Sequence, residues 1–385
     1  MPLRNAPSNL PTTLRFMASR VLKRASVDGT AAGIIFRARV ERVVDRLKRE
    51  IVECRFVTVR STRDWSATGI DLPEHADVTI MADGMVHLSR AFDVGFFPKV
   101  GLWYRIGDGE VGKIVGGGST VWTERAGSLQ FLTKPPGEFL DRRGTLDPQL
   151  PRDALSGAFE VAVIHWRVPP AQGLAAAAAV DADLFNPVLQ RLKQPVEPPK
   201  GWHYLWRLGD GEIFRSTGAA GHGELCCHTS SDVGILQHPI DHPLTADSQL
   251  SWSWCVEQLP SAISEHIQPT HDYLSIAIEF DNGLDLTYMW STSMPVGTVF
   301  QCPLPWWDQR ETHWVVRSGR ADLGKWLDEK RPILADYEVA IGGTPPKKAV
   351  AVWLIANTCF QRGEGKCRYR AIAVEDGDRR SVVST

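Results

Sequence analysis

The pattern of hydrophobic and polar residues changes its period near residue 53. Residues 32–52, AAGIIFRARVERVVDRLKREI, repeat apolar side chains at steps of three and four, which predicts one amphipathic helix. The apolar members of this repeat are Phe36, Val40, Val43, Val44, Leu47 and Ile51. We expect this face to pack on a domain, with the Arg- and Lys-rich face in solvent. The alternative is a basic helix on a membrane surface, but the interleaved Glu41, Asp45 and Glu50 count against it.

From residue 54 to residue 168 the period becomes two, which is typical of strands with one buried face. The run opens with CRFVTVRS and closes with FEVAVIHWRV, and Gly and Pro clusters separate the strands between them. We predict an antiparallel β-sandwich or jelly roll for this segment. Residues 169–200 then place Pro pairs around an Ala-rich stretch, which predicts a linker that holds a short helix.

Strand patterning returns after residue 200, in segments such as YLSIAIEFDN, LDLTYMWSTS and KAVAVWLIANT. One helical element, at 321–342, interrupts it. The predicted fold is therefore mainly β: two antiparallel, jelly-roll-like β-sandwich domains with an N-terminal amphipathic helix. The expected domains are 1–53 for the N-terminal extension and helix, 54–168 for the first sandwich, 169–200 for the linker, and 201–385 for the second sandwich, the candidate active domain.

A short repeat accompanies the two sandwiches. RIGDGEV at 105–111 returns as RLGDGEI at 207–213, each time after an aromatic residue. Gly and Asp supply the backbone conformations of a tight turn, so we predict a hairpin used twice, with the Arg and the Glu facing each other across the strands. A duplicated ligand loop is the alternative.

Composition excludes several classes of function. The formal net charge of −2 gives no broad basic surface for nucleic acid. No apolar run reaches the length of a membrane span, and the N-terminus lacks the pattern of a secretory signal, so a cytoplasmic location is expected. Seven cysteines without CxxC spacing favour free thiols. No NAD, FAD or ATP motif is present, and the sequence does not predict another cofactor or the oligomeric state.

The first sandwich resembles a known family. WSATGIDLPEHADVTIMADGMV, GLWYRIGDGE and GSLQFLTKPPGEF, within residues 65–166, resemble the galactose-binding bacterial lectin type, a small calcium-dependent β-sandwich. In those lectins an Asn/Asp-rich loop after the GSL strand binds calcium and sugar. Here that loop reads KPPGEFLDRRGTLD, where Glu138, Asp141 and Asp147 are the oxygen donors, Asn is absent and two Pro intrude. The resemblance therefore implies the fold, and we expect no tight calcium site.

The second sandwich resembles a bacterial family of unknown function. Residues 203–374 carry the resemblance through LSWSWCVEQLP, HDYLSIAIEF, KWLDEKRPILADYEVAIGGTPP and VAVWLIANT. Members often have paired carboxylates where this chain has THDY, and an Asp-rich segment near IANTCFQRGEGKC. This chain keeps one Asp in the first place and has Asn357 and two Cys in the second. The resemblance implies a second β-sandwich and brings no reaction with it.

Candidate chemistry concentrates in two segments of the second sandwich. The densest is PLPWWDQRETHW, where two adjacent Trp can wall a pocket beside titratable groups. The second is THDY, which places a His and an Asp where a strand begins; a His with a carboxylate neighbour can act as a general base. We expect the two segments to converge. The catalytic candidates are His271, Asp272, His313 and Asp308, and the substrate-binding candidates are Trp306, Trp307, Trp314 and Arg310.

No metal site is assigned from the sequence. The weaker candidates are His238, Asp241 and His242 in QHPIDHP, which we interpret as a polar loop. The leading hypothesis is a cytoplasmic enzyme without a nucleotide cofactor. It would act on a small aromatic or apolar molecule in a Trp-lined pocket by His/Asp acid–base chemistry, as a lyase, isomerase or hydrolase. The first alternative is a non-catalytic carbohydrate-binding protein, and the second is a metal- or haem-dependent enzyme with His ligands.

Overall fold

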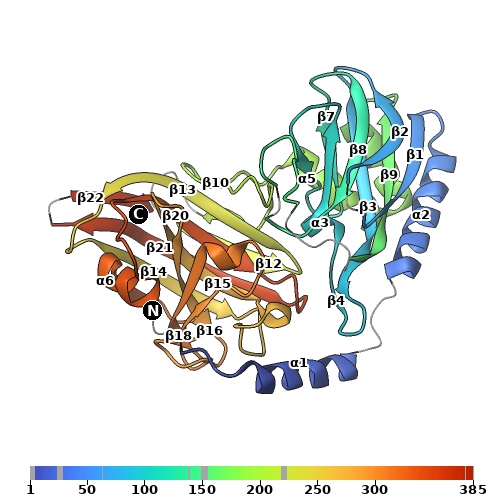
Figure 1. The fold of residues 1–385 in the computed structure, drawn as a ribbon. Helices are drawn as coiled ribbons and strands as arrows, with labels where there is room; N and C mark the ends of the chain where they lie inside the picture. Colours follow the sequence, from blue (N-terminus) through green and yellow to red (C-terminus); the bar gives the residue numbers. More distant parts are fainter. Residues whose placement is uncertain are drawn as a thin grey trace. The chain divides into compact units, whose positions relative to one another are not determined.

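The chain folds into two compact units dominated by strands (Figure 1). The computed structural model describes residues 5–23, 29–62, 64–137, 139–148, 155–217, 223–377 and 379–384. One unit is Leu22–Val196, and the other joins Met1–Val21 to Glu197–Thr385. We refer to them as the 22–196 unit and the 197–385 unit.

The 22–196 unit is a sandwich of two antiparallel sheets. Its described elements are α2 (Gly29–Arg46), β1 (Ile51–Arg60), β2 (Ser66–Leu72), β3 (Asp77–Ser89), β4 (Val94–Phe96), α3 (Pro98–Gly101), β5 (Leu102–Ile106), β6 (Gly112–Lys113), β7 (Gly118–Trp122), β8 (Gly127–Thr133), β9 (Ser156–Trp166), α4 (Pro170–Val180) and α5 (Ala182–Lys193). One sheet has the order β1-β9-β3-β4, with β7 also paired to β3, and the other has the order β2-β8-β5-β6. The predicted β-sandwich is confirmed.

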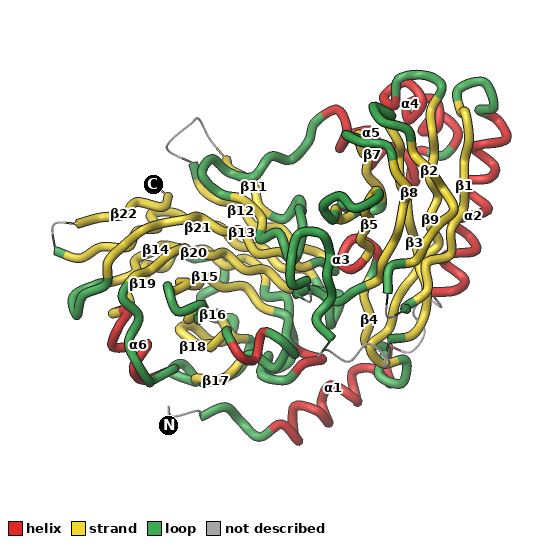
Figure 2. The backbone as a smooth tube through the Cα atoms, turned by 45° about the horizontal axis from the view of Figure 1, so that its top comes forward, coloured by secondary structure: helices red, strands yellow, loops and turns green. Residues whose placement is uncertain are grey.

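Helices α2, α4 and α5 pack against the sheet that contains β3 and β9. The shared core consists of Phe36, Val40, Val43, Leu47, Ile51, Met81, Ala162, Ile164, Trp166, Leu174, Ala177, Phe185, Val188 and Leu189. The apolar stripe predicted for the helix therefore faces this sheet, although the helix ends at Arg46 and Ile51 already begins β1. The segment expected as a linker with one short helix folds as both α4 and α5, tube segments that Figure 2 colours as helix.

The 197–385 unit is the larger sandwich. Its described elements are α1 (Asn9–Lys23), β10 (His203–Tyr204), β11 (Phe214–Thr217), β12 (Glu224–Ser230), β13 (Val233–Pro243), β14 (Gln249–Gln258), η1 (Gln268–Thr270), β15 (Tyr273–Phe280), β16 (Asp285–Ser291), β17 (Val299–Gln301), η2 (Trp307–Gln309), β18 (Glu311–Ser318), β19 (Leu327–Pro332), α6 (Ile333–Ala340), β20 (Lys348–Asn357), β21 (Glu364–Asp376) and β22 (Arg379–Ser384). Its larger sheet has the order β10-β13-β20-β15-β16-β18-β17. The other has the order β11-β12-β21-β14-β19, with β22 also paired to β21.

The core of this unit lies between its two sheets, which Figure 1 shows face to face. Alternate side chains of β15, β16 and β20 point inward and meet those of β14 and β21. The largest of them are Trp252, Trp254, Trp290, Tyr288 and Tyr369. The intervening residues of β15, β16 and β18 lie on the opposite face of the larger sheet, which we call its outer face. Many of these residues are polar and still buried, as in Ser275, Asp285 and Thr287.

Two helices differ from what the sequence pattern predicts. Residues 9–23, for which no helix was predicted, form α1. The pattern concealed this helix because Phe16 is buried on one side while Leu10 and Leu14 are exposed on the other, so no face is purely polar. The helix expected at 321–342 is shorter, since β19 occupies 327–332 and only α6 follows it.

The two Gly-Asp-Gly copies serve different connections. The first joins β5 to β6 as a hairpin, with Gly107 at φ +58°. The second lies between β10 and β11, which belong to different sheets, so the second hairpin was wrongly predicted. Arg105 bonds Gln130 rather than the Glu of its own loop. The repeated sequence therefore forms two different connections, and the loop structure is not duplicated.

Candidate metal centre

Strand β18 places a glutamate and a histidine side by side on the outer face of the larger sheet. Glu311 and His313 are two residues apart in β18, so their side chains share one face of the sheet. The intervening Thr312 and the following Trp314 point the other way, and Trp314 packs against the core between the sheets. The parallel neighbour β16 sets Asp285 opposite Glu311.

Two further residues reach the same point from the ends of neighbouring strands. Cys302 directly follows β17, and its backbone N–H donates to the carbonyl oxygen of Glu311 at 3.0 Å. His271 lies two residues before the start of β15, and its carbonyl oxygen accepts a 2.8 Å hydrogen bond from Asn357. His271, Cys302, Glu311 and His313 thus converge, and all four are buried.

Two pairs of donor atoms have the spacing of neighbouring ligands in a tetrahedral metal site. One ligand atom from each of the four residues lies within 4.8 Å of the others. Cys302 Sγ is 3.5 Å from His271 Nε2, and His313 Nε2 is 3.4 Å from Glu311 Oε1. A tetrahedral ion with bonds of about 2.0–2.3 Å has ligand atoms roughly 3.3–3.8 Å apart. These two measured pairs fall in that range.

Hydrogen bonds from outside the cluster orient the donors. Nδ1 of His271 lies 2.6 Å from the Glu265 carbonyl oxygen, so it carries the proton and leaves Nε2 as the acceptor that faces Cys302. Glu311 Oε1 accepts from Tyr273 Oη at 2.8 Å and from Thr287 Oγ1 at 3.3 Å. Such second contacts fix the direction of imidazole and carboxylate ligands in metal sites.

The ring of His313 is the least satisfied group of the cluster. It is fully buried, and neither of its nitrogens has a hydrogen-bond partner among the described residues. Its contact with Glu311 lacks the alignment of a hydrogen bond. Phe300 stacks on the ring at 4.8 Å and 10°, and His271 meets it at 4.8 Å and 90°. A buried imidazole held this firmly and left unpaired is the expected form of a metal ligand.

Burial sets the protonation of the cluster. Burial lowers the pKa of His271 to about 4 and the pKa of His313 well below its usual value, so both rings are neutral at pH 7. Burial, followed by the nearby Glu311, raises the pKa of the Cys302 thiol. The pKa of Asp285 is also raised well above its usual value, first by burial and then by Glu311. Burial also raises the pKa of Glu311, so this pair of carboxyl groups resists carrying two negative charges.

The side chains of Asp272 and His271 have different partners. The Asp272 carboxylate accepts from the backbone N–H groups of Phe360 at 3.0 Å and Gln361 at 2.7 Å. Burial raises its pKa to about 7. This carboxylate closes a turn after β20, whereas His271 faces Cys302 and His313. Asp308, in η2, is exposed, and no hydrogen bond joins its side chain to His313 among the described residues.

The aromatic candidates do not gather around the two histidines. Trp307 is buried with its ring edge-on to Trp306 at 4.8 Å. Arg310 lies 5.1 Å from the Trp306 ring centroid, and its guanidinium is 3.6 Å from Glu279. Trp314 lies on the core side of β18, opposite His313. The structure thus brings His271 and His313 together, whereas the Trp and Arg candidates have other partners.

The weaker metal candidates have separate partners. The segment QHPIDHP is part of β13, not a loop. Asp241 pairs with Lys348 at 2.7 Å, and His242 Nδ1 lies 3.0 Å from Ser381 Oγ. The ring of His238 meets that of Trp202 edge-on. The three side chains do not converge on one point.

The loop expected at the lectin calcium position is organised around Asp141. Its carboxylate accepts from the backbone N–H of Arg143 at 2.9 Å and from the hydroxyl of Thr145 at 2.7 Å. The hydrogen bonds from Thr145 lower the pKa of Asp141. Glu138 lies outside the described residues. Asp141 therefore acts as the acceptor of a turn within its own loop.

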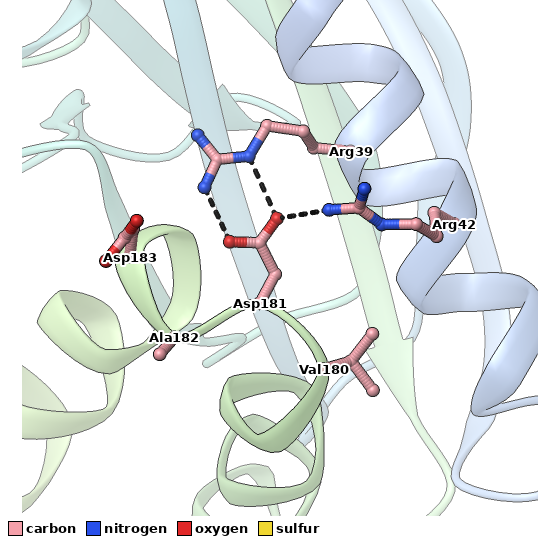
Figure 3. Close-up of a pocket in the computed structure, with 6 residues that line it drawn as sticks. All are labelled: Arg39, Arg42, Val180, Asp181, Ala182 and Asp183. Atoms are coloured by element: carbon pink, nitrogen blue, oxygen red, sulfur yellow. Dashed lines mark hydrogen bonds and ion pairs between the residues drawn. The ribbon is translucent and has the colours of Figure 1, made fainter.

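A surface pocket in the 22–196 unit contains a closed ion cluster (Figure 3). Asp181 accepts two hydrogen bonds from Arg39 and one from Arg42, and it also caps α5 through the backbone N–H of Leu184. The hydrogen bond from Arg39 is the main cause of the lowered pKa of Asp181. The cluster ties α2 to the start of α5, which gives it a structural role.

Sequence reasoning missed Cys302 and gave Glu311 no role. Glu311 and His313 carry one signal, since residues two apart in a strand share a face. Cys302 carries none, because its place depends on β17 lying beside β18. The centre is visible only once the strand order is known.

Comparisons with known proteins give one family match and several distant solved structures. The family model described as a protein of unknown function (DUF3047) matches residues 207–373. No curated protein matches the chain. Among solved structures, the N-terminal domain of EclA, a PllA-like lectin, is 16% identical with a TM-score of 0.23, and the match covers 30% of this chain and 98% of that one.

Two further solved structures are a xyloglucanase domain and a protein from a xyloglucan utilization locus. The xyloglucanase domain of NopAA, a type three effector from Sinorhizobium fredii solved with cellobiose, is 11% identical with a TM-score of 0.28, and the match covers 46% of this chain and 93% of that domain. SGBP-B from a xyloglucan utilization locus of Bacteroides uniformis is 10% identical with a TM-score of 0.24, and the match covers 83% and 73%. Likeness at this level says nothing about what this chain binds.

The helices give one further negative finding. Among the described residues, no helix is both long and apolar enough to cross a membrane.

Proposed function

We propose that the 197–385 unit is a zinc-binding β-sandwich whose ion is held by His271, Cys302, Glu311 and His313. The observation that carries the proposal is the convergence of four buried donors within 4.8 Å, one of them an imidazole with no other partner among the described residues. Two imidazoles, one thiolate and one carboxylate form a donor set that suits Zn²⁺. Carboxylate-only sites suit calcium and magnesium, and haem sites take fewer protein ligands.

The closed arrangement supports a structural role for the ion. Structural zinc sites use four protein ligands, whereas catalytic sites keep one position open for water or substrate. All four ligand residues are at most 2% exposed. Acid–base chemistry by His271 or His313 on a substrate needs access that this burial denies. We therefore rank a metal-stabilised binding domain above the enzyme hypothesis.

Metal analysis of the purified chain tests the proposal. We expect one zinc per chain, retained through dialysis and removed by a strong chelator. His313→Gln should abolish stoichiometric zinc, because it removes a ligand whose only role is coordination. His228→Gln is the matched control, since His228 is exposed and pairs with Glu364 at 2.6 Å. A wild-type chain that binds no zinc, or a His313→Gln variant that still binds one, would overturn the proposal.

A second candidate function is sugar binding by the 22–196 unit, which an exposed aromatic platform supports. Trp122 is 53% exposed, and the ring of His75 stacks on it at 5.6 Å and 23°. His75 is held at φ +60°, with its N–H bonded to the Thr123 carbonyl oxygen at 2.8 Å. The Thr123 hydroxyl also bonds Ala76 N and Pro73 O. A rigid loop that presents an aromatic face can stack on the apolar face of a pyranose ring.

Binding to a panel of oligosaccharides tests this second candidate. Trp122→Ala should weaken binding by about tenfold, which is ~1.4 kcal/mol. Phe92→Ala is the matched control, because Phe92 is another exposed aromatic residue of the same unit, at 39%. Equal affinity in the two variants, or no binding by the wild-type chain, would remove this candidate.

A further inference from the structure

The N-terminal segment of the chain is attached to the strand that leads to Cys302. Asn5 makes three hydrogen bonds there: its N–H donates to the Val299 carbonyl oxygen at 3.2 Å, its Oδ1 accepts from Val299 N at 2.7 Å, and its Nδ2 donates to the Gly297 carbonyl oxygen at 3.3 Å. β17 is an edge strand of three residues. It is thus held by β18 on one side and by Asn5 on the other.

The same segment is attached at its other end near His271. Arg20 is 6% exposed, and its guanidinium donates to the Phe360 carbonyl oxygen at 2.8 Å. The N–H of Phe360 is bonded in turn to Asp272, the residue after His271. Between these attachments, Thr12 and Phe16 are buried, at 5% and 2% exposure. Thr12, Phe16 and Arg20 recur every four residues and form the inner face of α1.

A stack of rings connects this segment to the ligands. The backbone of Ser8 lies against the buried ring of His266. His266 meets Phe300 edge-on at 6.5 Å, and Phe300 stacks on His313. Figure 1 draws the residues that lead into α1 beside the β16 and β18 end of the unit, and Figure 2 draws them next to β17. The segment from Asn5 to Arg20, which we call the strap, therefore covers this side of the centre.

We infer that the strap controls how fast a metal ion enters and leaves the centre. The inference rests on the proposed zinc site. Cys302 and His271 come from separate segments, and the strap is attached near both. Asn5 holds β17 and hence Cys302, while Arg20 holds the turn after β20, whose backbone also bonds Asp272, the residue after His271. Loss of either ligand must precede release of the ion. Release requires local opening, and the exposed hydrogen bonds of Asn5 are the weakest part of the enclosure.

The strap should affect both release and uptake of the metal ion. A loosened strap lowers the barrier for the ion to leave and for the ion to enter, while the four ligands and their geometry stay the same. The rates of release and uptake should then rise together, and the equilibrium affinity should change much less than either rate. A substitution that damages the ligands has a different signature, because it weakens the affinity itself.

The experiment measures zinc release from the full-length, zinc-loaded chain into an excess of a chromophoric chelator. We expect Asn5→Ala and Phe16→Ala each to raise the release rate at least about tenfold, and the double variant to raise it further. Leu14→Ala is the matched control: Leu14 lies on the outer face of the same helix at 57% exposure, so the release rate should not change. Zinc uptake by the metal-free chain is followed in parallel.

The outcomes separate the two proposals. If the wild-type chain binds no zinc, both the proposed function and the inferred role of the strap are wrong. If it binds one zinc but Asn5→Ala and Phe16→Ala release it at the wild-type rate, only the inferred role of the strap in metal exchange is overturned. If release and uptake do not accelerate together, so that the affinity falls as much as the release rate rises, the strap supports the ligands and does not control exchange. Circular dichroism of each variant establishes that the unit remains folded.

Discussion

Cys302→Ser is the sharpest test of the metal centre, because it removes one ligand atom with almost no change in shape. Cys302 is 1% exposed, and its Sγ lies 3.5 Å from His271 Nε2. An ion that binds the folded but not the unfolded chain stabilises it by about 4.1 kcal/mol at a concentration 1,000 times its Kd. In a unit of this size ~1 kcal/mol shifts the Tm by about 2–4 °C. Zinc should therefore raise the wild-type Tm by about 8–16 °C.

The variant should lose most of this shift. A hydroxyl is a much poorer zinc ligand than a thiolate, so we expect a loss of at least about 100-fold in affinity, or ~2.7 kcal/mol. The zinc-induced shift in Tm should then fall by about 5–11 °C. The substitution also costs stability without zinc, since it buries a hydroxyl, so the comparison uses the difference between zinc and chelator for each protein.

The assay is thermal unfolding followed by circular dichroism, with zinc or with EDTA. Cys226→Ser provides the control, because Cys226 lies on β12, in the other sheet of the sandwich, and is only partly buried. Its zinc-induced shift should equal that of the wild type. Equal shifts in Cys302→Ser and Cys226→Ser, or no shift in the wild type, would refute the assignment of Cys302 as a ligand.

Three further predictions follow from the protonation and hydrogen bonds of single groups. Glu311→Gln should abolish stoichiometric zinc binding, whereas Asp285→Asn should preserve it, because Asp285 is not among the four converging donors and burial raises the pKa of its carboxyl; equal zinc contents in the two variants would contradict this. Burial raises the pKa of the Cys302 thiol, so binding should release at least one proton and the affinity should rise about tenfold per pH unit per proton near neutrality, which calorimetry in buffers of different ionisation enthalpy measures. Calcium titration should show no stoichiometric site in the wild type, and Asp141→Ala should leave that titration unchanged, because the backbone N–H and the hydroxyl of Thr145 already bond the Asp141 carboxylate; a stoichiometric calcium site in the wild type that is lost in the variant would contradict this.

The periodic parts of the fold follow from the sequence, and the remainder depends on tertiary context. The α2 stripe is predictable because Val40 and Val43 meet only one neighbour, the sheet beneath them. α1 is not, because its two faces are both partly apolar. The helix expected at 321–342 contains β19 because residues 327–332 pair with β14. Pairing of this kind leaves no local signal.

The candidate centre shows the same division. His271 and His313 stand out in the sequence as titratable residues at the edges of strong strand patterns. Their convergence depends on the parallel pairing of β16 with β18 and on β17 folding back beside β18, which no local pattern indicates. Cys302 becomes a candidate only through that topology. Asp272 looks like the partner of His271 in the sequence, but its carboxylate bonds the backbone after β20.

The energetics of the outer face favour a bound cation over a chance cluster. A buried polar atom without a partner costs about 1–3 kcal/mol, and a whole domain is stable by only about 5–15 kcal/mol. Both nitrogens of His313 are in this state, as is one carboxylate oxygen of Asp285. If these groups were buried without a bound ion, apolar substitutions in the β-sandwich would remove their free-energy cost. Coordination gives one His313 nitrogen a partner and offsets the charge of the Glu311 carboxylate, so the chelator-treated chain should be the less stable form.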